Sequence, residues 1–161
     1  MNAEFKGYIL RVESIAEMRD EIRVLHGRHY KETETKYLDH HMEPDYDGFA
    51  ALEAQGAFLC YIARHGETGQ MVGYLMFFVS KSLHMDARVA QEDAYYVVSE
   101  HRGTGLGRQL LRNAEKDLAT RGVDYVFMSS KKPVGGPNIG PLLEIEGYGE
   151  VAEVYAKRIR S

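Results

Sequence analysis

The sequence predicts a mixed α/β (α+β) fold in one layered domain, and three observations support this. The length of 161 residues suits a single domain, residues 1–161, with a core of ordinary size. Apolar runs of strand length alternate with segments of helical periodicity. One strand–helix–strand unit in the second half predicts a parallel pair of strands, because a helical crossover joins strands that run the same way.

The bulk composition is that of a globular protein, with 44% apolar and 27% charged residues. A net charge of −4 argues against a nucleic-acid-binding protein, which usually carries a basic excess. The longest apolar run, Met71 to Val79, is too short to span a bilayer. The single cysteine, Cys60, excludes an internal disulfide, and no charged-then-apolar leader opens the chain. We therefore expect a cytoplasmic protein.

The first third of the chain is expected to form one strand and one helix. Tyr8–Val12 reads as the strand. Ser14 and Glu17 match a capping box, which predicts a helix from near Ser14 to about Lys36. Its apolar residues follow at helical spacing: Ile15, Met18, Ile22 and Leu25. A loop is expected next, and then a helical turn over Phe49–Glu53.

Three strands are expected in the middle of the chain. Ala57–Arg64 and Met71–Ser80 are separated by Gly66–Gly69, which suits a hairpin. Apolar residues occupy both alternating sets of Met71–Ser80, so we expect this strand to be buried on both faces. Gln91–Val98 is the next expected strand.

The last third is expected to alternate helix and strand. A helix over Gly105–Arg121 carries one apolar face, and the strand Val123–Ser129 follows it. A loop rich in glycine and proline leads to a short helix over Leu142–Glu146. Val151–Ile159 is expected to form a closing strand.

A glycine-rich turn, residues 102–107 (the glycine turn), separates a strand from a helix. Such a turn leaves N–H groups uncovered at the positive end of the helix dipole, where a phosphate or pyrophosphate binds well. The chain lacks the G-x-x-x-x-G-K-[ST] loop of nucleotide triphosphatases, and Arg108 stands where a dinucleotide fingerprint has its third glycine. Arg102, Gly105 and Gly107 instead satisfy [QR]-x-x-G-x-[GA]. A turn that merely needs glycines is the alternative.

The stretch from Tyr96 to Leu111 resembles the central motif of the GNAT N-acetyltransferase superfamily. The similarity extends to Val123–Met128, to Leu142–Tyr148 and to a closing segment with Tyr155 and Lys157. The chain is also similar to members from bacterial and phage genomes. The resemblance implies a single N-acetyltransferase domain. Its central mixed, mostly antiparallel sheet has helices on both faces and a splayed parallel strand pair.

The resemblance also implies acetyl-CoA as cosubstrate and no metal. The pantetheine arm would lie in the gap between the splayed strands, beside the backbone of Tyr96, Val97 and Val98. The pyrophosphate would sit on the N–H groups of the glycine turn: Arg102, Gly103, Thr104, Gly105, Leu106 and Gly107. Arg108 would add a cationic contact, and Asn138 resembles an asparagine of the family motif.

Two carboxylates are candidates for the general base that removes a proton from the attacking amine. Glu92 and Asp93 lie on the strand that leads to the glycine turn. Because successive strand residues face opposite ways, only one should point into the cleft, and Glu92 is slightly favoured. Both being solvated charges is the alternative, and His84 in the preceding loop is a further candidate.

The general acid is not assigned by the resemblance. The family places a tyrosine four residues before the glycine matched by Gly147, and here that residue is Leu143. Tyr148, Tyr155 or bulk water could protonate the departing thiolate instead.

Other reactive side chains have simpler interpretations. Cys60 could carry an acyl group, but it shares a strand face with apolar neighbours, so a buried core residue is favoured. His26 and His29 could share a metal, but a polar helix surface is favoured.

The region from His26 to Tyr46 corresponds to the acceptor side of the cleft in the superfamily. Acidic residues in and just after it could attract a cationic amine, or could form an ordinary solvated run: Glu32, Glu34, Asp39, Glu43, Asp45 and Asp47. The function expected is direct transfer of an acetyl group to a primary amine of a small molecule or peptide. The resemblance also implies a homodimer, a state common in similar proteins, although the sequence itself does not fix the oligomeric state. The alternative is a non-catalytic acyl-CoA-binding module.

Overall fold

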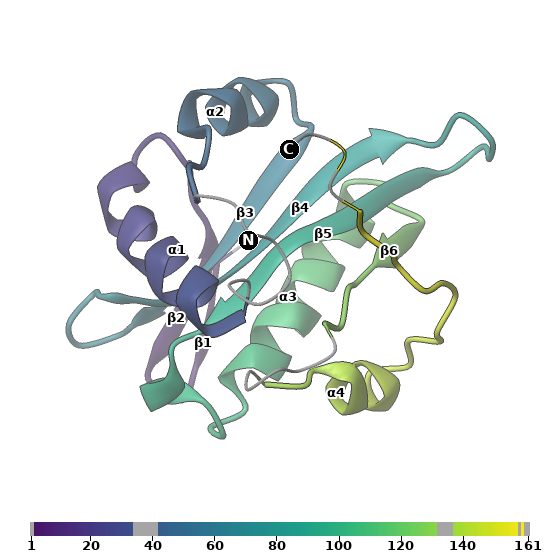
Figure 1. The fold of residues 1–161 in the computed structure, drawn as a ribbon. Coiled ribbons are helices and arrows are strands. Elements are labelled where there is room, and N and C mark those ends of the chain that lie inside the picture. The colour runs from purple at the N-terminus through teal and green to yellow at the C-terminus, as the bar shows by residue number, and fades with distance from the viewer. Residues whose placement is uncertain (1, 34–41, 132–136, 158, 160–161) are drawn as a thin grey trace.

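The computed structural model describes residues 2–33, 42–131, 137–157 and 159 (Figure 1). In this part of the chain, six strands form one sheet in the order β1-β2-β3-β4-β5-β6. Every neighbouring pair is antiparallel except β5 and β6, which run parallel, so the predicted mixed, mostly antiparallel sheet is confirmed. The strands are β1 Asn2–Phe5, β2 Tyr8–Val12, β3 Phe58–His65, β4 Met71–Lys81, β5 Arg88–Val97 and β6 Tyr125–Phe127.

Helices cover both faces of the sheet, as predicted. Helices α1 (Arg19–Thr33) and α2 (Tyr46–Ala54) lie on one face, and α3 (Leu106–Thr120) lies on the other (Figure 1). The short helix α4 (Gly140–Ile145) sits beside α3, and Arg112 of α3 bonds to Glu146 just after α4. Among the described residues, no helix combines the length and apolar character that crossing a bilayer requires.

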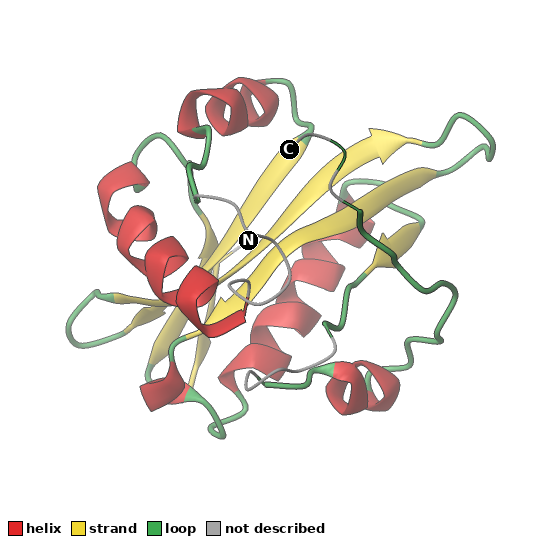
Figure 2. Cartoon of the chain, viewed as in Figure 1, coloured by secondary structure: helices red, strands yellow, loops and turns green. Residues whose placement is uncertain are grey.

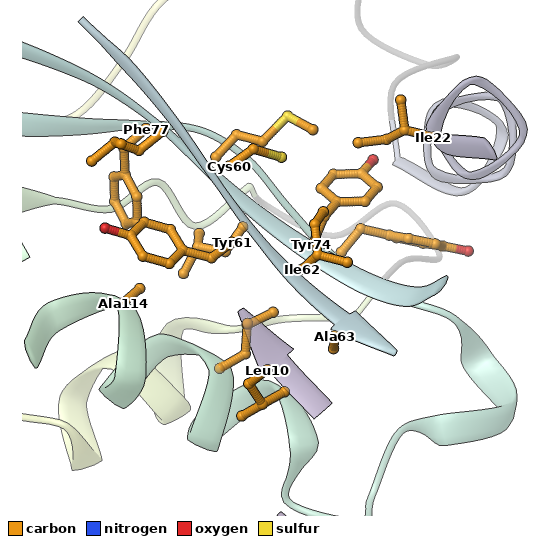
Figure 3. Close-up of a cluster of buried hydrophobic side chains, with 14 of the residues drawn as sticks. Leu10, Ile22, Cys60, Tyr61, Ile62, Ala63, Tyr74, Phe77 and Ala114 are labelled. Atoms are coloured by element: carbon orange, nitrogen blue, oxygen red, sulfur yellow. The ribbon is translucent and has the colours of Figure 1, made fainter. Parts of the chain in front are cut away.

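The core lies on both sides of β3 and β4, which are buried along most of their length. Figure 3 shows Tyr61 and Phe77 on the α3 side and Tyr74 beside Ile22 of α1. The expectation that Met71–Ser80 is buried on both faces is therefore confirmed. Cys60 is fully buried, and burial raises the pKa of its thiol well above the usual value. The interpretation of Cys60 as a core residue is confirmed.

The beginning of the chain differs from the prediction. Asn2–Phe5 forms an unexpected strand that pairs with β2 through a tight turn at Lys6 and Gly7. The predicted capping box is wrong, because the Ser14 hydroxyl donates to the Glu53 carboxylate at 2.8 Å and α1 begins later, at Arg19. Glu53 belongs to α2, so a long-range contact takes the place of the local one.

The C-terminal expectation is also wrong. Residues 151–157 and 159 form no strand, and their apolar side chains face solvent, with Val154 90% and Tyr155 85% exposed. Sequence alternation suits a strand, but a strand needs a paired neighbour or a packed face to be stable. The described structure offers this segment neither.

Candidate functional site

The site begins where β5 and β6 separate. Parallel pairing runs from Val89 opposite Tyr125 to Gln91 opposite Phe127 and ends there. Strand β5 continues to Val97 without a partner on that side among the described residues (Figure 2). The predicted splayed pair is therefore confirmed, and we call the point of separation, at Gln91 and Phe127, the fork. Beyond the fork, β5 has an open edge.

A β-bulge lies immediately beyond the fork. On β4, Phe77 pairs with Glu92 and Met76 pairs with Ala94, which leaves Asp93 as the extra residue. A bulge bends the strand and re-aims its side chains, and bulges often lie beside active sites. Simple alternation therefore does not describe how Glu92 and Asp93 are oriented.

Glu92 lies at the fork. Its carboxylate accepts the N–H of Ser129, just past the end of β6, at 3.2 Å. Burial raises the pKa of Glu92 to about 7, although the Ser129 hydrogen bonds oppose this shift. The neighbouring Asp93 is exposed, and partial removal from water raises the pKa of its carboxyl too. A carboxyl with a pKa near 7 is suited to accepting a proton at neutral pH.

The glycine turn lies at the other end of the open edge of β5. Gly103 and Gly105 have φ angles of 75° and 87°, a region that favours glycine. The Thr104 hydroxyl donates to the His101 carbonyl at 2.9 Å and accepts the Leu106 N–H at 3.3 Å, which holds the turn. Within the described ranges, five N–H groups have no acceptor: those of Gly103, Thr104, Gly105, Gly107 and Arg108.

Those N–H groups stand at the N-terminus of α3, whose first turn holds no acidic residue. The helix dipole and the uncovered N–H groups together favour an anion there. The residues of the turn therefore suit an anion such as a phosphate group.

Gly107 has a different role from Gly103 and Gly105. A Cβ at Gly107 would lie 2.6 Å from the Tyr95 hydroxyl oxygen, too close for a real contact. The sequence interpretation missed Tyr95, whose phenol has no hydrogen-bond partner in the described structure. Strand alternation could have indicated it, because Tyr95 faces away from Tyr96 on the strand that precedes the turn.

Both arginines expected near the phosphate are paired with carboxylates. Arg102 donates to Glu32 of α1 at 2.5 Å and to the Val97 carbonyl at 2.7 Å. Arg108 donates to Glu146, as Arg112 does. Neither guanidinium is directed to the uncovered N–H groups in this structure.

The backbone expected to meet the pantetheine arm is only partly available. The Val98 N–H donates to the Val72 carbonyl at 2.9 Å, and the Val97 carbonyl accepts from Arg102. Tyr96 pairs with Tyr74 of β4 on its other side. Among the described residues, the unpaired edge of β5 therefore runs mainly from the bulge to Tyr96.

Hydrogen-bonded and stacked histidines and tyrosines line the face of the sheet that α1 covers (the α1 face). His26 shares a hydrogen bond with the Tyr46 hydroxyl at 3.0 Å, and His29 shares one with the Tyr74 hydroxyl at 2.7 Å. The His29 ring also stacks on Tyr96 with centroids 4.8 Å apart. Burial lowers the pKa of both histidines to about 4, so both are neutral at pH 7. The polar-surface interpretation of His26 and His29 is wrong.

These histidines and tyrosines of the α1 face are connected to the glycine turn through Glu32. The Tyr96 hydroxyl donates to Glu32 at 2.7 Å, and Glu32 in turn holds Arg102. These contacts hold the pKa of the Glu32 carboxyl below its usual value, although burial opposes the shift. One carboxylate of α1 therefore links the α1 face of the sheet to the turn.

The other acidic residues of this region have local roles where they are described. Asp45 accepts the Gly48 N–H and caps α2, and Asp47 pairs with Arg19 at 2.7 Å. Glu43 is exposed. Glu34 and Asp39 lie outside the described residues.

The remaining candidates are spread over the molecule. Tyr148 donates to Glu115 of α3 at 2.6 Å and borders a cavity of about 350 Å³ between α3 and β6. Asn138 accepts the Gly140 N–H at 3.0 Å at the start of α4. The Tyr155 hydroxyl donates to Glu153 on the exposed C-terminal segment, and His84 lies in an exposed loop. Leu143, in the position of the family tyrosine, is buried in the core.

No metal-binding group was identified among the described residues, where three or more His, Cys, Asp or Glu side chains do not gather closely enough. The structure thus brings Glu92 and Asp93 to one end of an open strand edge and the glycine turn to the other. It leaves Tyr155 outside this arrangement.

Comparison with known proteins gives a consistent result. Residues 19–134 match the model of the Acetyltransferase (GNAT) family. No curated protein matches the chain significantly.

Solved structures share the fold at low sequence identity. A ribosomal-protein-alanine N-acetyltransferase from Brucella melitensis biovar Abortus 2308 is 20% identical with a TM-score of 0.69, over 93% of this chain and 99% of that one. An aminoglycoside acetyltransferase from an uncultured soil metagenomic sample is 19% identical with a TM-score of 0.70, over 96% and 98%. A glucosamine-6-phosphate N-acetyltransferase from Arabidopsis thaliana is 15% identical with a TM-score of 0.70, over 95% and 99%.

Proposed function

The chain belongs to the GNAT family of acetyltransferases, and from this premise we propose that it transfers an acetyl group from acetyl-CoA directly to a primary amine. The observation that carries the proposal is the set of uncovered N–H groups in the glycine turn. They stand at the N-terminus of α3, at one end of the open edge of β5. The diphosphate binds at the turn, and the pantetheine arm extends along β5 toward the fork.

The carboxylate of Glu92 acts as general base. It accepts a proton from the ammonium of the acceptor, either directly or through one water, and its pKa of about 7 suits that task. The free amine attacks the thioester carbonyl, a carbon–nitrogen bond forms, and the carbon–sulfur bond breaks. Holding amine and thioester side by side supplies much of the rate, since this reaction is slow but spontaneous in water.

The departing thiolate takes a proton from Tyr148 or from water. Tyr148 lies against α3, but burial and the hydrogen bond to the Glu115 carboxylate raise the pKa of its phenol well above the usual value, so water is the better proton donor. Tyr155 remains a prediction without support from its exposed position.

The acceptor class is a primary amine of a small molecule or peptide. Proteins of similar structure include an aminoglycoside acetyltransferase, a glucosamine-6-phosphate N-acetyltransferase and a ribosomal-protein-alanine N-acetyltransferase. These acceptors share little besides an amino group. A cytoplasmic location and a homodimer complete the proposal.

The experiment combines a thermal-shift assay with acetyl-CoA and a thiol-release screen over amines, polyamines, amino acids and peptides. Stabilisation by acetyl-CoA together with thiol release for at least one amine is expected. No stabilisation by acetyl-CoA, or stabilisation by ATP or NAD instead, would contradict the proposal.

A non-catalytic acyl-CoA-binding module is the second candidate. One observation favours it: Leu143 is buried where the family has its tyrosine. This module predicts stabilisation by acetyl-CoA and no thiol release with any amine in the screen.

A further inference from the structure

The hairpin formed by β1 and β2 reaches the glycine turn from the other end of the chain (Figure 1). The Lys6 ammonium donates to the Thr104 carbonyl at 3.4 Å, across 98 residues of sequence. A Cβ at Gly105 would lie 3.5 Å from the ring of Phe5, so this ring stands directly beside the turn. Lys6 is therefore a cation beside the uncovered N–H groups.

The hairpin is held in this position by its own contacts. The Gly7 carbonyl accepts the Gly66 N–H at 2.7 Å, which fastens the hairpin to the turn between β3 and β4. A Cβ at Gly66 would lie 2.6 Å from that carbonyl oxygen, so the two backbones approach closely. The place of the Lys6 backbone is thus fixed by the fold, while its side chain is exposed to solvent.

The backbone of Lys6 is unusual. Its φ angle of 47° makes it the one non-glycine residue with a positive φ in the described ranges. Two-residue hairpin turns of this kind prefer asparagine, aspartate or glycine in that place, because a larger side chain is strained there. Lysine has no advantage for the turn itself, and residues held in unfavourable backbone conformations concentrate at functional sites. A functional role of the Lys6 side chain would explain why a lysine occupies this strained position.

The charges around the glycine turn leave Lys6 as the available cation. Arg102 is paired with Glu32, and Arg108 is paired with Glu146. Among the described side chains no carboxylate pairs with Lys6, whose ammonium lies 5.2 Å from the centre of the Phe5 ring. An exposed, flexible ammonium of this kind can follow a phosphate oxygen as it settles on the turn.

We propose that Lys6 binds the diphosphate of coenzyme A at the glycine turn. This inference rests on the proposed function, because it assigns a further residue to the same cofactor site. The N-terminal hairpin thereby supplies the cationic contact that the two nearby arginines do not. Since the contact is exposed to solvent, its contribution weakens as salt concentration rises.

The test compares Lys6→Asn with the wild-type protein by NMR titration of CoA, dephospho-CoA and pantetheine. Asparagine tolerates a positive φ, so this variant removes the charge and keeps the turn. Affinity for both CoA and dephospho-CoA is expected to fall about threefold to tenfold, as for one exposed charge-assisted contact. Affinity for pantetheine, which has no phosphate, is expected to stay unchanged.

Two further variants serve as controls. Lys6→Arg is expected to keep CoA affinity within about twofold of wild type, because it keeps the charge. Lys116→Gln removes an exposed lysine further along α3 and is expected to leave CoA affinity unchanged.

Each contrary result is distinct. Unchanged CoA affinity in Lys6→Asn overturns the inference and leaves the proposed function standing. A loss of affinity for CoA but not for dephospho-CoA would show that Lys6 contacts the 3′-phosphate. An equal loss of affinity for pantetheine would show an effect other than charge. Either result overturns the assignment of Lys6 to the diphosphate. Wild-type protein that does not bind CoA overturns the proposed function and this inference with it.

Discussion

The glycine turn and the α1 face of the sheet lie near one another at the end of β5, but they are built from different groups. The turn presents main-chain N–H groups, held by Gly103 and Gly105 at positive φ. The α1 face presents side chains, with His26 and His29 each bonded to a tyrosine. A main-chain site is visible in the sequence as glycines, whereas a side-chain site becomes visible only after the helix is packed on the sheet.

The two regions also differ in what would disrupt them. The turn tolerates changes of side chain except where a positive φ or a close approach requires glycine. The α1 face depends on buried polar groups that must stay paired, since an unpaired buried polar group is costly. Glu32 joins the regions through Arg102 and Tyr96.

The largest effect is expected from Gly105→Glu. It places a carboxylate against the proposed diphosphate and should abolish CoA binding in calorimetry. The φ angle of 87° also strains any side chain, at a cost of about 1–3 kcal/mol in stability. Gly105→Ala carries the same strain without the charge and should still bind CoA. If both variants bind CoA equally well, the turn does not hold the diphosphate.

Glu92→Gln is expected to lower kcat about 100-fold, because it removes the proposed base. In the wild type, kcat/KM should fall as pH drops below about 7, since Glu92 must be ionised to accept a proton. The variant should lose this dependence. It should also be more stable than wild type at pH 8, because a carboxyl whose pKa is raised by folding destabilises the folded state once ionised.

Asp93→Asn is the matched control for that experiment. Asp93 is the exposed bulge residue beside Glu92, and its substitution should change kcat much less. A larger loss of kcat in Asp93→Asn than in Glu92→Gln would reverse the assignment of the base.

Gly107→Ala tests the close approach of Tyr95 to α3. The added Cβ would lie 2.6 Å from the Tyr95 oxygen, so we expect the free energy of unfolding to fall by about 1–2 kcal/mol in urea denaturation. Tyr95→Phe in the same chain removes that oxygen and should restore most of the loss. No loss in Gly107→Ala would show that the Tyr95 ring moves aside freely.

The smallest effect on CoA binding and catalysis is expected from the histidines of the α1 face, whose protonation acts on stability. Their pKa is about 4 in the folded protein against 6.5 for an ordinary histidine, so the unfolded chain takes up protons first as pH falls. The contribution of these histidines to the free energy of unfolding should therefore be fully present above pH 6.5, and each histidine should lower that free energy by about 2 kcal/mol between pH 7 and pH 5. His26→Gln should flatten this slope, whereas the exposed His84→Gln should leave it unchanged. Equal slopes in all three proteins would contradict burial of a neutral His26.

The parts of the fold that were predicted correctly are those with a strong local signal. The hairpin of β3 and β4 was visible because alternating apolar runs flank a glycine turn, and α3 was visible from its apolar face. The splayed pair followed from the resemblance to a known family and agrees with the end of pairing at Gln91.

The parts that were missed depend on contacts between distant residues. Ser14 bonds to Glu53 rather than capping its own helix, and His26 is buried because α1 turns it toward Tyr46. Strand β1 is short and only half-buried, so its pattern is weak. The closing segment with Tyr155 alternates like a strand but has no neighbour to pair with in the described structure.

The most direct test of the central claim is a crystal structure of the protein with acetyl-CoA. We expect diphosphate oxygens within about 2.7–3.2 Å of the N–H groups of the glycine turn, with the thioester near Glu92 at the fork. A diphosphate bound elsewhere on the molecule, with these N–H groups contacting only water, would contradict it.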